Sequence, residues 1–112
     1  MVGIADVRQL TKGLPRSYEA TVGGRVKFQV GRIVYLAFSR DESLLGFAFP
    51  KEERAGLIAG APDTFMMPRP SDQRYNWVVV RLAAIDDVEL RELVLDAWRL
   101  VVPKRIAAEH LG

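Results

Sequence analysis

The sequence predicts an α+β fold, in which a mainly antiparallel sheet is packed by helices in a single-domain, two-layer sandwich. A strictly alternating segment at 25–30 is followed by two apolar runs after short turns, which is typical of a three-stranded meander. Apolar residues three and four positions apart between 90 and 101 indicate a long amphipathic helix near the carboxyl end. A chain of 112 residues with 49% apolar content can bury one hydrophobic core. We therefore expect one domain over 1–112.

The first half of the chain predicts one helix and the meander. Apolar residues at helical spacing from Ile4 onward predict a helix over 3–12, which Gly13 and Pro15 end. In the strand 25–30, Val26, Phe28 and Val30 face one side, while Arg25, Lys27 and Gln29 give the other side a basic character. A turn at Gly31 and Arg32 leads to a strand over 33–38, and a polar turn leads to a strand over 44–49.

The second half predicts two further helices and one strand. Pro50 begins a short helix that ends at Gly60, followed by an irregular proline-rich connection with an edge segment at 65–67. The next strand, over 75–82, places Tyr75, Trp77, Val79 and Arg81 on one face. Asp86 and Glu89 form a capping-box pattern at the start of the long helix, which Pro103 ends before a short final helix or tail over 104–111.

Composition excludes several classes of site. The absence of cysteine removes thiol nucleophiles, thiolate metal sites and disulfides, and it fits a reducing compartment such as the cytoplasm. No window approaches the run of about 18 apolar residues that a membrane span needs, and the amino terminus lacks the pattern of a signal peptide. We expect a cytoplasmic protein that does not enter a membrane.

Charge is unevenly distributed along the chain, although the formal net charge is only +2. Residues 1–40 hold seven basic and two acidic groups, and 64–82 hold three basic and one acidic. Residues 41–63 hold two basic and five acidic groups, and 83–112 hold four basic and six acidic. A fold that gathers the two basic segments on one side would attract a polyanion.

The sequence lacks a recognisable catalytic or cofactor signature. His110 is the single histidine and lies near the chain end, where a surface position is the ordinary interpretation. The acidic pairs Asp41-Glu42, Glu52-Glu53 and Asp86-Asp87 fall at turns and helix starts, where carboxylates have structural reasons to be. The glycines do not form a phosphate-binding loop. We expect no enzyme activity, catalytic residue, metal or cofactor.

Two surfaces have both a functional and a structural interpretation. The basic residues of the first hairpin could lie along a phosphate backbone, or they could form an ordinary solvated strand face. Tyr75, Trp77 and Arg81 could stack on bases or on a partner, although a second helix covering that face would make them part of the core. For this aromatic face, a place in the hydrophobic core is the better supported interpretation.

Short motifs along most of the chain resemble the MmcQ/YjbR family of small bacterial proteins. They are RYNWVVVRL at 74–82, LRELVLDAWRLVVPKR at 90–105, the pair Leu14-Pro15 that ends the first helix, and Lys27-Phe28 in the first strand. Ala97-Trp98 departs from the pattern, because Ser-Tyr is common there. The resemblance implies a sandwich similar to the CyaY-like and double-wing arrangements, and a DNA-binding label that rests largely on fold analogy.

Carried over to this sequence, the two wings would be the hairpin around Gly31 and the loop 68–74, which fall in the two basic segments. Our first hypothesis is a non-enzymatic DNA-binding protein in which five basic side chains neutralise phosphates: Arg25, Lys27, Arg32, Arg69 and Arg74. The alternative is a protein-interaction or small-ligand module that uses a groove lined by Met66, Met67, Tyr75, Trp77 and Arg81.

Overall fold

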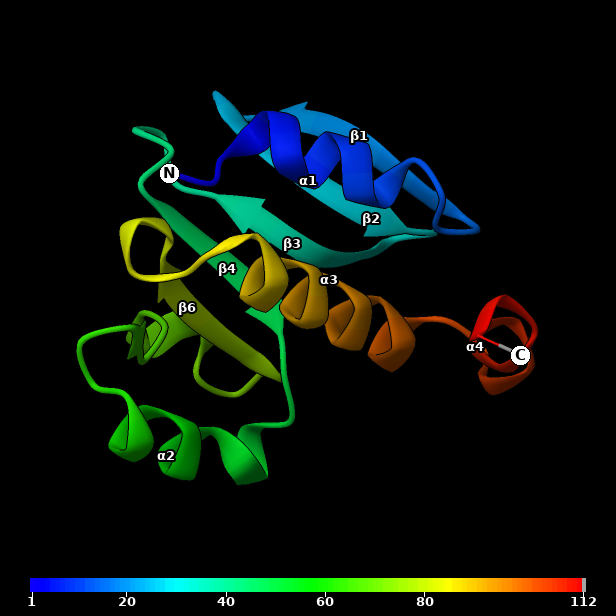
Figure 1. Ribbon diagram of the computed structural model, residues 1–112. Coiled ribbons are helices and arrows are strands. Elements are labelled where there is room, and N and C mark those ends of the chain that lie inside the picture. Colours follow the sequence, from blue (N-terminus) through cyan, green and yellow to red (C-terminus); the bar gives the residue numbers. More distant parts are fainter. Residues whose placement is uncertain (112) are drawn as a thin grey trace.

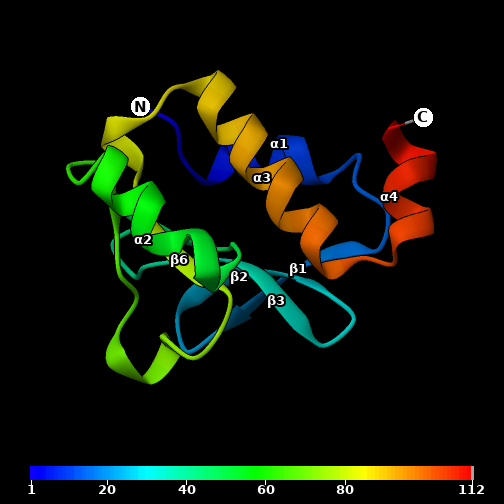
Figure 2. The same cartoon turned by 90° about the horizontal axis from the view of Figure 1, so that it is seen from below.

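The computed structural model describes residues 1–111, and it contains one six-stranded sheet with helices on one of its faces (Figures 1 and 2). The strand order is β1-β2-β3-β4-β6-β5, and every pair of neighbours is antiparallel. The strands are β1 (Ser17–Val22), β2 (Arg25–Val30), β3 (Ile33–Phe38), β4 (Leu44–Ala48), β5 (Phe65–Met66) and β6 (Trp77–Arg81). The helices are α1 (Ile4–Thr11), α2 (Lys51–Gly60), α3 (Asp87–Val101) and α4 (Lys104–Leu111), with short 3₁₀ turns at Pro70–Asp72 and Leu82–Ala84.

The predicted α+β, two-layer architecture is confirmed, with one strand more in the meander than expected. The sequence predicted three strands from 25 to 49, whereas β1 precedes them and makes a four-stranded meander. The segment of β1 lacks the alternation of a half-buried strand, because it lies at the edge of the sheet and has no fully buried residue. The strand predicted over 75–82 is shorter, Trp77–Arg81, since Tyr75 and Asn76 belong to the preceding loop.

The core lies between the sheet and α3. Antiparallel partners share a face, so the register aligns Phe28, Leu36, Phe47 and Val78 in one buried row across four strands. The apolar stripe of α3 covers this row with four buried residues, Leu90, Val94, Ala97 and Trp98. Burial of that stripe holds the helix on the sheet, and the predicted capping box at Asp86 fixes the helix start.

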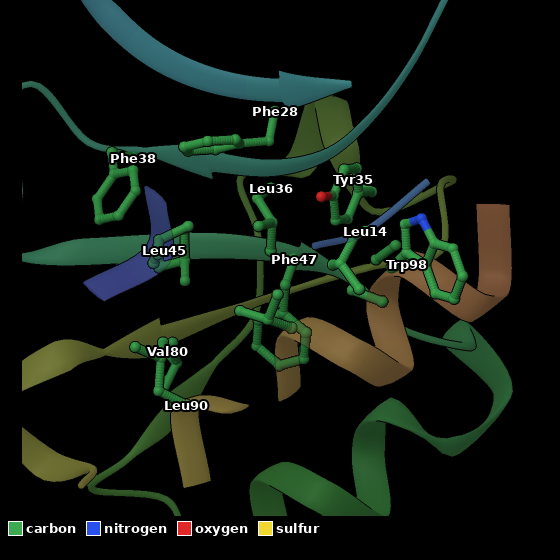
Figure 3. Close-up of a cluster of buried hydrophobic side chains, with 14 of the residues drawn as sticks. Leu14, Phe28, Tyr35, Leu36, Phe38, Leu45, Phe47, Val80, Leu90 and Trp98 are labelled. Carbon is green, nitrogen blue, oxygen red and sulfur yellow. The ribbon is translucent and has the colours of Figure 1, made fainter. Parts of the chain in front are cut away.

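Trp98 connects three parts of the chain at one end of the core. Its indole is fully buried, and its Nε1–H donates a hydrogen bond to the carbonyl oxygen of Pro15 at 2.9 Å. Figure 3 shows Leu14 and Tyr35 beside it. His110 of α4 approaches from outside, with 5.0 Å between the ring centroids, so the last helix packs onto this end of the molecule.

Tyr35 marks an irregularity in the sheet. The register pairs Phe28 with Leu36 and then Gln29 with Val34, so β3 contains one extra residue, Tyr35. Its side chain is fully buried on the helix side, and its hydroxyl lies 2.5 Å from the Ser17 hydroxyl. Pairing of β3 with β4 covers only Leu36–Phe38, and Figure 1 shows the two strands diverging beyond that point.

Among residues 1–111, no helix has both the length and the apolar character that crossing a bilayer requires.

The capping box predicts a measurable stability effect. Asp86 accepts a hydrogen bond from the Glu89 backbone N–H at 2.9 Å, so Asp86→Ala should lower the free energy of unfolding by about 1 kcal/mol. Urea denaturation followed by circular dichroism measures this change. Asp87→Ala is the control, because Asp87 occupies the first helical position and should cost only a few tenths of a kcal/mol. Equal losses in both variants would contradict the assignment of the cap.

Tyr35 predicts an alkaline loss of stability. Burial raises the pKa of the Tyr35 phenol, and the hydrogen bond with Ser17 offsets this only in part. The folded-state pKa lies above the unfolded value of about 10, so ionisation of the phenol disfavours the folded state. The stabilisation that the neutral Tyr35 side chain provides is therefore complete below pH 10, and it declines as the pH rises through the folded-state pKa. Tyr35→Phe should be about 1 kcal/mol less stable at pH 7, and it should lose less stability than the parent protein between pH 9 and 11 in urea titrations. Parallel curves for the two proteins would refute this.

Candidate nucleic-acid and ligand-binding face

The face of the sheet opposite the helices is the candidate functional site, and the strand register determines its composition. Antiparallel partners place Ala20, Lys27, Ala37, Gly46 and Val79 in a row across five strands on this face. Arg25 and Trp77 lie two residues along β2 and β6 from members of this row, and therefore share its face. We call this surface the open face.

Small residues hollow the centre of the open face. Ala37 and Ala48 form the floor of a cavity of about 550 Å³, and Trp77 forms part of its wall. The Trp77 indole rests on Gly46, where a side-chain Cβ would meet three ring atoms at 2.6–2.8 Å. Gly46 is therefore required for the position of this ring, as is typical of a strand glycine at a site of close approach.

Two cations on β2 line the same cavity. Arg25 and Lys27 are half-buried on the open face, and Arg25 Nε–H donates to the carbonyl oxygen of Phe38 at 3.1 Å. In the part of the chain that the structure describes, neither side chain forms an ion pair with a carboxylate. Their charge is available to a bound anion.

The loop 68–76 forms the opposite wall and brings a third cation, Arg69. Arg69 forms an exposed ion pair with Asp72 at 3.4 Å, and both residues line the cavity with Tyr75 and Asn76. An exposed pair of this length contributes little to stability, so Arg69 can exchange Asp72 for another anion. Arg74 lies outside the cavity lining, because its guanidinium stacks over the Tyr75 ring at 4.8 Å.

Arg54 on α2 holds this loop in place. Its guanidinium is buried, and it donates three hydrogen bonds to backbone carbonyls: Gln73 at 2.9 Å, Trp77 at 3.0 Å and Tyr75 at 3.3 Å. Asn76 Oδ1 also accepts a hydrogen bond from the backbone N–H of Lys51 at 3.0 Å. The start of α2 thus fixes the backbone that carries Tyr75 and Trp77 to the cavity.

The divergence of β3 and β4 extends the cavity beyond the sheet face. Ile33 and Val34, in the part of β3 that does not pair with β4, line it together with Leu100 and Val101 at the end of α3. The site therefore combines residues of the β2–β3 hairpin, the loop 68–76 and the last turn of α3.

The structure brings together some members of each predicted residue set. Arg25, Lys27 and Arg69 of the basic set line the cavity, whereas Arg32 is exposed on the β2–β3 turn beside it and Arg74 stacks on Tyr75. Of the alternative set, Tyr75 and Trp77 line the cavity. Met66 and Arg81 lie apart, where Arg81 Nη1 approaches Met66 Sδ at 3.6 Å, and Met67 is exposed.

The expectation that a second helix buries the aromatic face is wrong. The helices lie on the other side of the sheet (Figure 2), so Trp77 is half-buried and both Tyr75 and Arg81 are exposed. The alternation of β6 does not tell whether a helix covers this face, because apolar residues such as Trp77 and Val79 suit both a covered face and an open one. The position of the helices in the fold decides between the two arrangements.

Sequence reasoning missed Arg54 and Gly46. Arg54 precedes Leu57 and Ile58 by three and four residues, so helical spacing places it on the inner face of α2. Gly46 interrupts an apolar strand, which is a signal of a bulge or a close contact. Both signals are present in the sequence, but the partners of the two residues come from the loop 73–77.

In the part of the chain that the structure describes, the strands contribute no acidic side chain to the open face. The strand residues assigned to it include no carboxylate among the described residues, whereas α3 exposes both signs of charge, with the carboxylates Asp87, Glu89, Glu92 and Asp96 and the guanidinium groups of Arg91 and Arg99. The predicted structural roles of acidic pairs are confirmed at Asp86, which caps α3, and at Asp41. Hydrogen bonds from Ser43 and Ser39 lower the pKa of the Asp41 carboxyl, as expected for a turn.

Within residues 1–111, no three His, Asp or Glu side chains cluster as metal ligands.

The geometry defines the class of protein: an α+β sandwich with helices on one face of the sheet and a hollow, cationic surface on the other. The YjbR family model matches residues 12–100, so the chain belongs to the YjbR family. The crystal structure of Deinococcus radiodurans protein DR2400, which has a DUF419 family-model domain, is similar in fold, with a TM-score of 0.79 at 20% identity. The match covers 98% of this chain and 88% of that one. No curated protein matches the chain.

Arg54 predicts a coupled loss of stability and of loop order. Arg54→Met keeps much of the side-chain volume but removes the donors to three carbonyls, so the free energy of unfolding should fall by about 3 kcal/mol. Hydrogen exchange measured by mass spectrometry should accelerate in 73–77 more than in α3. Glu52→Ala, at an exposed position of the same helix, should change stability by less than about 0.5 kcal/mol. An Arg54→Met protein as stable as this control would contradict the role assigned to Arg54.

Proposed function

We propose that this protein is a non-enzymatic, cytoplasmic DNA-binding protein that contacts the phosphate backbone with its open face. The observation that carries the proposal is the convergence of Arg25, Lys27 and Arg69, from two basic segments distant in sequence, on one cavity. Lys and Arg contacts to phosphates release condensed counterions, and this supplies most of the free energy of non-specific DNA binding.

The geometry of the two wings supports the same proposal. The β2–β3 turn carries Arg32, the loop 68–74 carries Arg69 and Arg74, and these segments border the cavity on different sides. A backbone laid between them would meet cations from both, with little need for contacts to base edges. The helix α3, which exposes four carboxylates, lies on the other side of the sheet (Figure 2), so these carboxylates would not repel a polyanion bound at the open face.

A protein-interaction module is the alternative from another class, and Tyr75 is the observation that favours it. Tyr75 is 52% exposed beside the half-buried Trp77, and aromatic residues of this kind often anchor protein partners. Binding of this kind would depend on these aromatic residues and only weakly on salt, which distinguishes it from phosphate contact.

The salt dependence of DNA binding tests the proposal. Fluorescence anisotropy of a labelled mixed-sequence duplex, with a single-stranded oligonucleotide alongside, should show affinity that falls steeply with salt. Each lost phosphate contact reduces the slope of log K against log salt by about 0.9, so Arg25→Gln/Lys27→Gln should reduce it by up to about 1.8. Arg32→Ala/Arg74→Ala should also flatten it if both wings make contacts.

The matched control is Arg91→Gln/Lys104→Gln, which removes the same charge from exposed positions of α3 and α4. Its slope should equal that of the parent protein. Equal slopes for the open-face double variant and this control would exclude the proposed interface. Absence of binding by the parent protein at low salt, where electrostatic binding is strongest, would exclude DNA as the partner.

A further inference from the structure

The cavity of the open face contains two kinds of surface that a phosphate backbone alone would not require. Ala37, Ala48, Val34 and Val101 supply apolar lining, and the Trp77 indole adds a flat aromatic surface. Because one side of this ring rests on Gly46, the part of the ring that remains available lies along the cavity. Flat apolar groups favour such a surface through area burial and offset stacking.

The charged part of the lining favours an anion. Arg25, Lys27 and Arg69 contribute three positive charges, and Asp72, which is paired with Arg69, contributes one negative charge. Arg25 uses its Nε–H on the Phe38 carbonyl, so its two Nη groups are left for a ligand. Half-burial of Arg25 and Lys27 places these donors in a less polar environment than bulk water, where charge-assisted hydrogen bonds are stronger.

The size and rigidity of the cavity are those of a small-molecule site. Its volume of about 550 Å³ falls within the range of roughly 300–1,000 Å³ typical of ligand pockets. The three hydrogen bonds from buried Arg54 hold the loop that forms one wall, so the cavity is formed before a ligand enters. A pre-formed site loses less conformational entropy on binding.

We propose that this cavity binds a small molecule that joins an anionic group, such as a carboxylate, to a flat apolar ring system. The anionic group would lie against Arg25 and Lys27, and the ring would lie along Trp77 over the floor of Ala37 and Ala48. A smaller cavity between α2 and α3, of about 210 Å³, is a poor competitor for such a ligand, because its lining includes the carboxylates of Glu89, Glu92 and Asp96 and, among the described residues, no cation.

The two tryptophans provide the readout. Trp98 is fully buried and its Nε1–H is bonded to Pro15, whereas Trp77 lines the cavity. In ¹⁵N-labelled protein titrated with 2-naphthoate, the indole N–H signal of Trp77 should shift and saturate while that of Trp98 stays in place. 2-Naphthalenemethanol, which has the ring without the charge, and acetate, which has the charge without the ring, should each bind at least about tenfold more weakly than 2-naphthoate.

Variants separate the contributions of charge and shape. Arg25→Gln/Lys27→Gln should weaken 2-naphthoate about tenfold or more and leave 2-naphthalenemethanol unchanged. Ala37→Leu should block both by filling the floor, and an unshifted Trp98 signal would verify that this variant is folded. Arg91→Gln/Lys104→Gln is the charge-matched control and should bind 2-naphthoate as the parent protein does. Unchanged indole signals in the parent protein, or equal 2-naphthoate affinity in both double variants, would overturn the proposal.

Competition separates this proposal from DNA binding, on which it does not depend. A ligand in the cavity neutralises Arg25 and Lys27, so 2-naphthoate should displace labelled duplex at concentrations that saturate the Trp77 signal. Saturation of that signal without displacement would remove the cavity cations from the DNA interface while leaving the ligand site established. Duplex binding without any response of the indole signals to 2-naphthoate would overturn the ligand site and leave the DNA-binding proposal in place.

Discussion

The extra residue in β3 is the constraint on which the candidate site depends. Because Tyr35 has no counterpart in the pairing of β2 with β3, both it and Leu36 are buried on the helix side, and the strand bends as bulged strands do. Pairing with β4 then begins only at Leu36, so the two halves of the sheet separate beyond it. The cavity extends through this opening to the end of α3. A regular strand at this position would keep the sheet closed.

Arg54 gives the site its second fixed boundary, by an arrangement in which a cation is buried among carbonyls. Burial of an arginine is costly unless its donors are satisfied, and three backbone oxygens of the loop 73–77 meet that requirement. The same bonds orient a loop with little regular structure of its own. The stability of the fold and the shape of the candidate site are therefore linked here, because the backbone that satisfies the buried Arg54 charge also carries the aromatic wall of the cavity.

The proposed phosphate contacts and the proposed ligand site share Arg25 and Lys27. Arg25 and Lys27 are half-buried in the cavity. A small anionic group that enters the cavity therefore reaches them more readily than the surface of a large molecule does. The exposed Arg32 and Arg74 at the margins are better placed for a large polyanion. If both activities exist, occupation of the cavity would reduce the positive potential of the face and couple the two equilibria.

Periodicity in the sequence determined the fold class, the long capped helix and most strands, because burial on one face imposes a strong pattern on each element. It also placed Arg25 and Lys27 on an outward strand face and grouped Tyr75 with Trp77, whereas Arg69 became a candidate through the basic charge of its segment and the family resemblance. It missed β1, because an edge strand without a fully buried residue carries no such pattern. Only the tertiary structure decided which face the helices cover, that Trp77 rests on Gly46, and that Arg54 reaches the loop 73–77. These facts depend on contacts between segments distant in sequence, and local spacing cannot specify which segments meet.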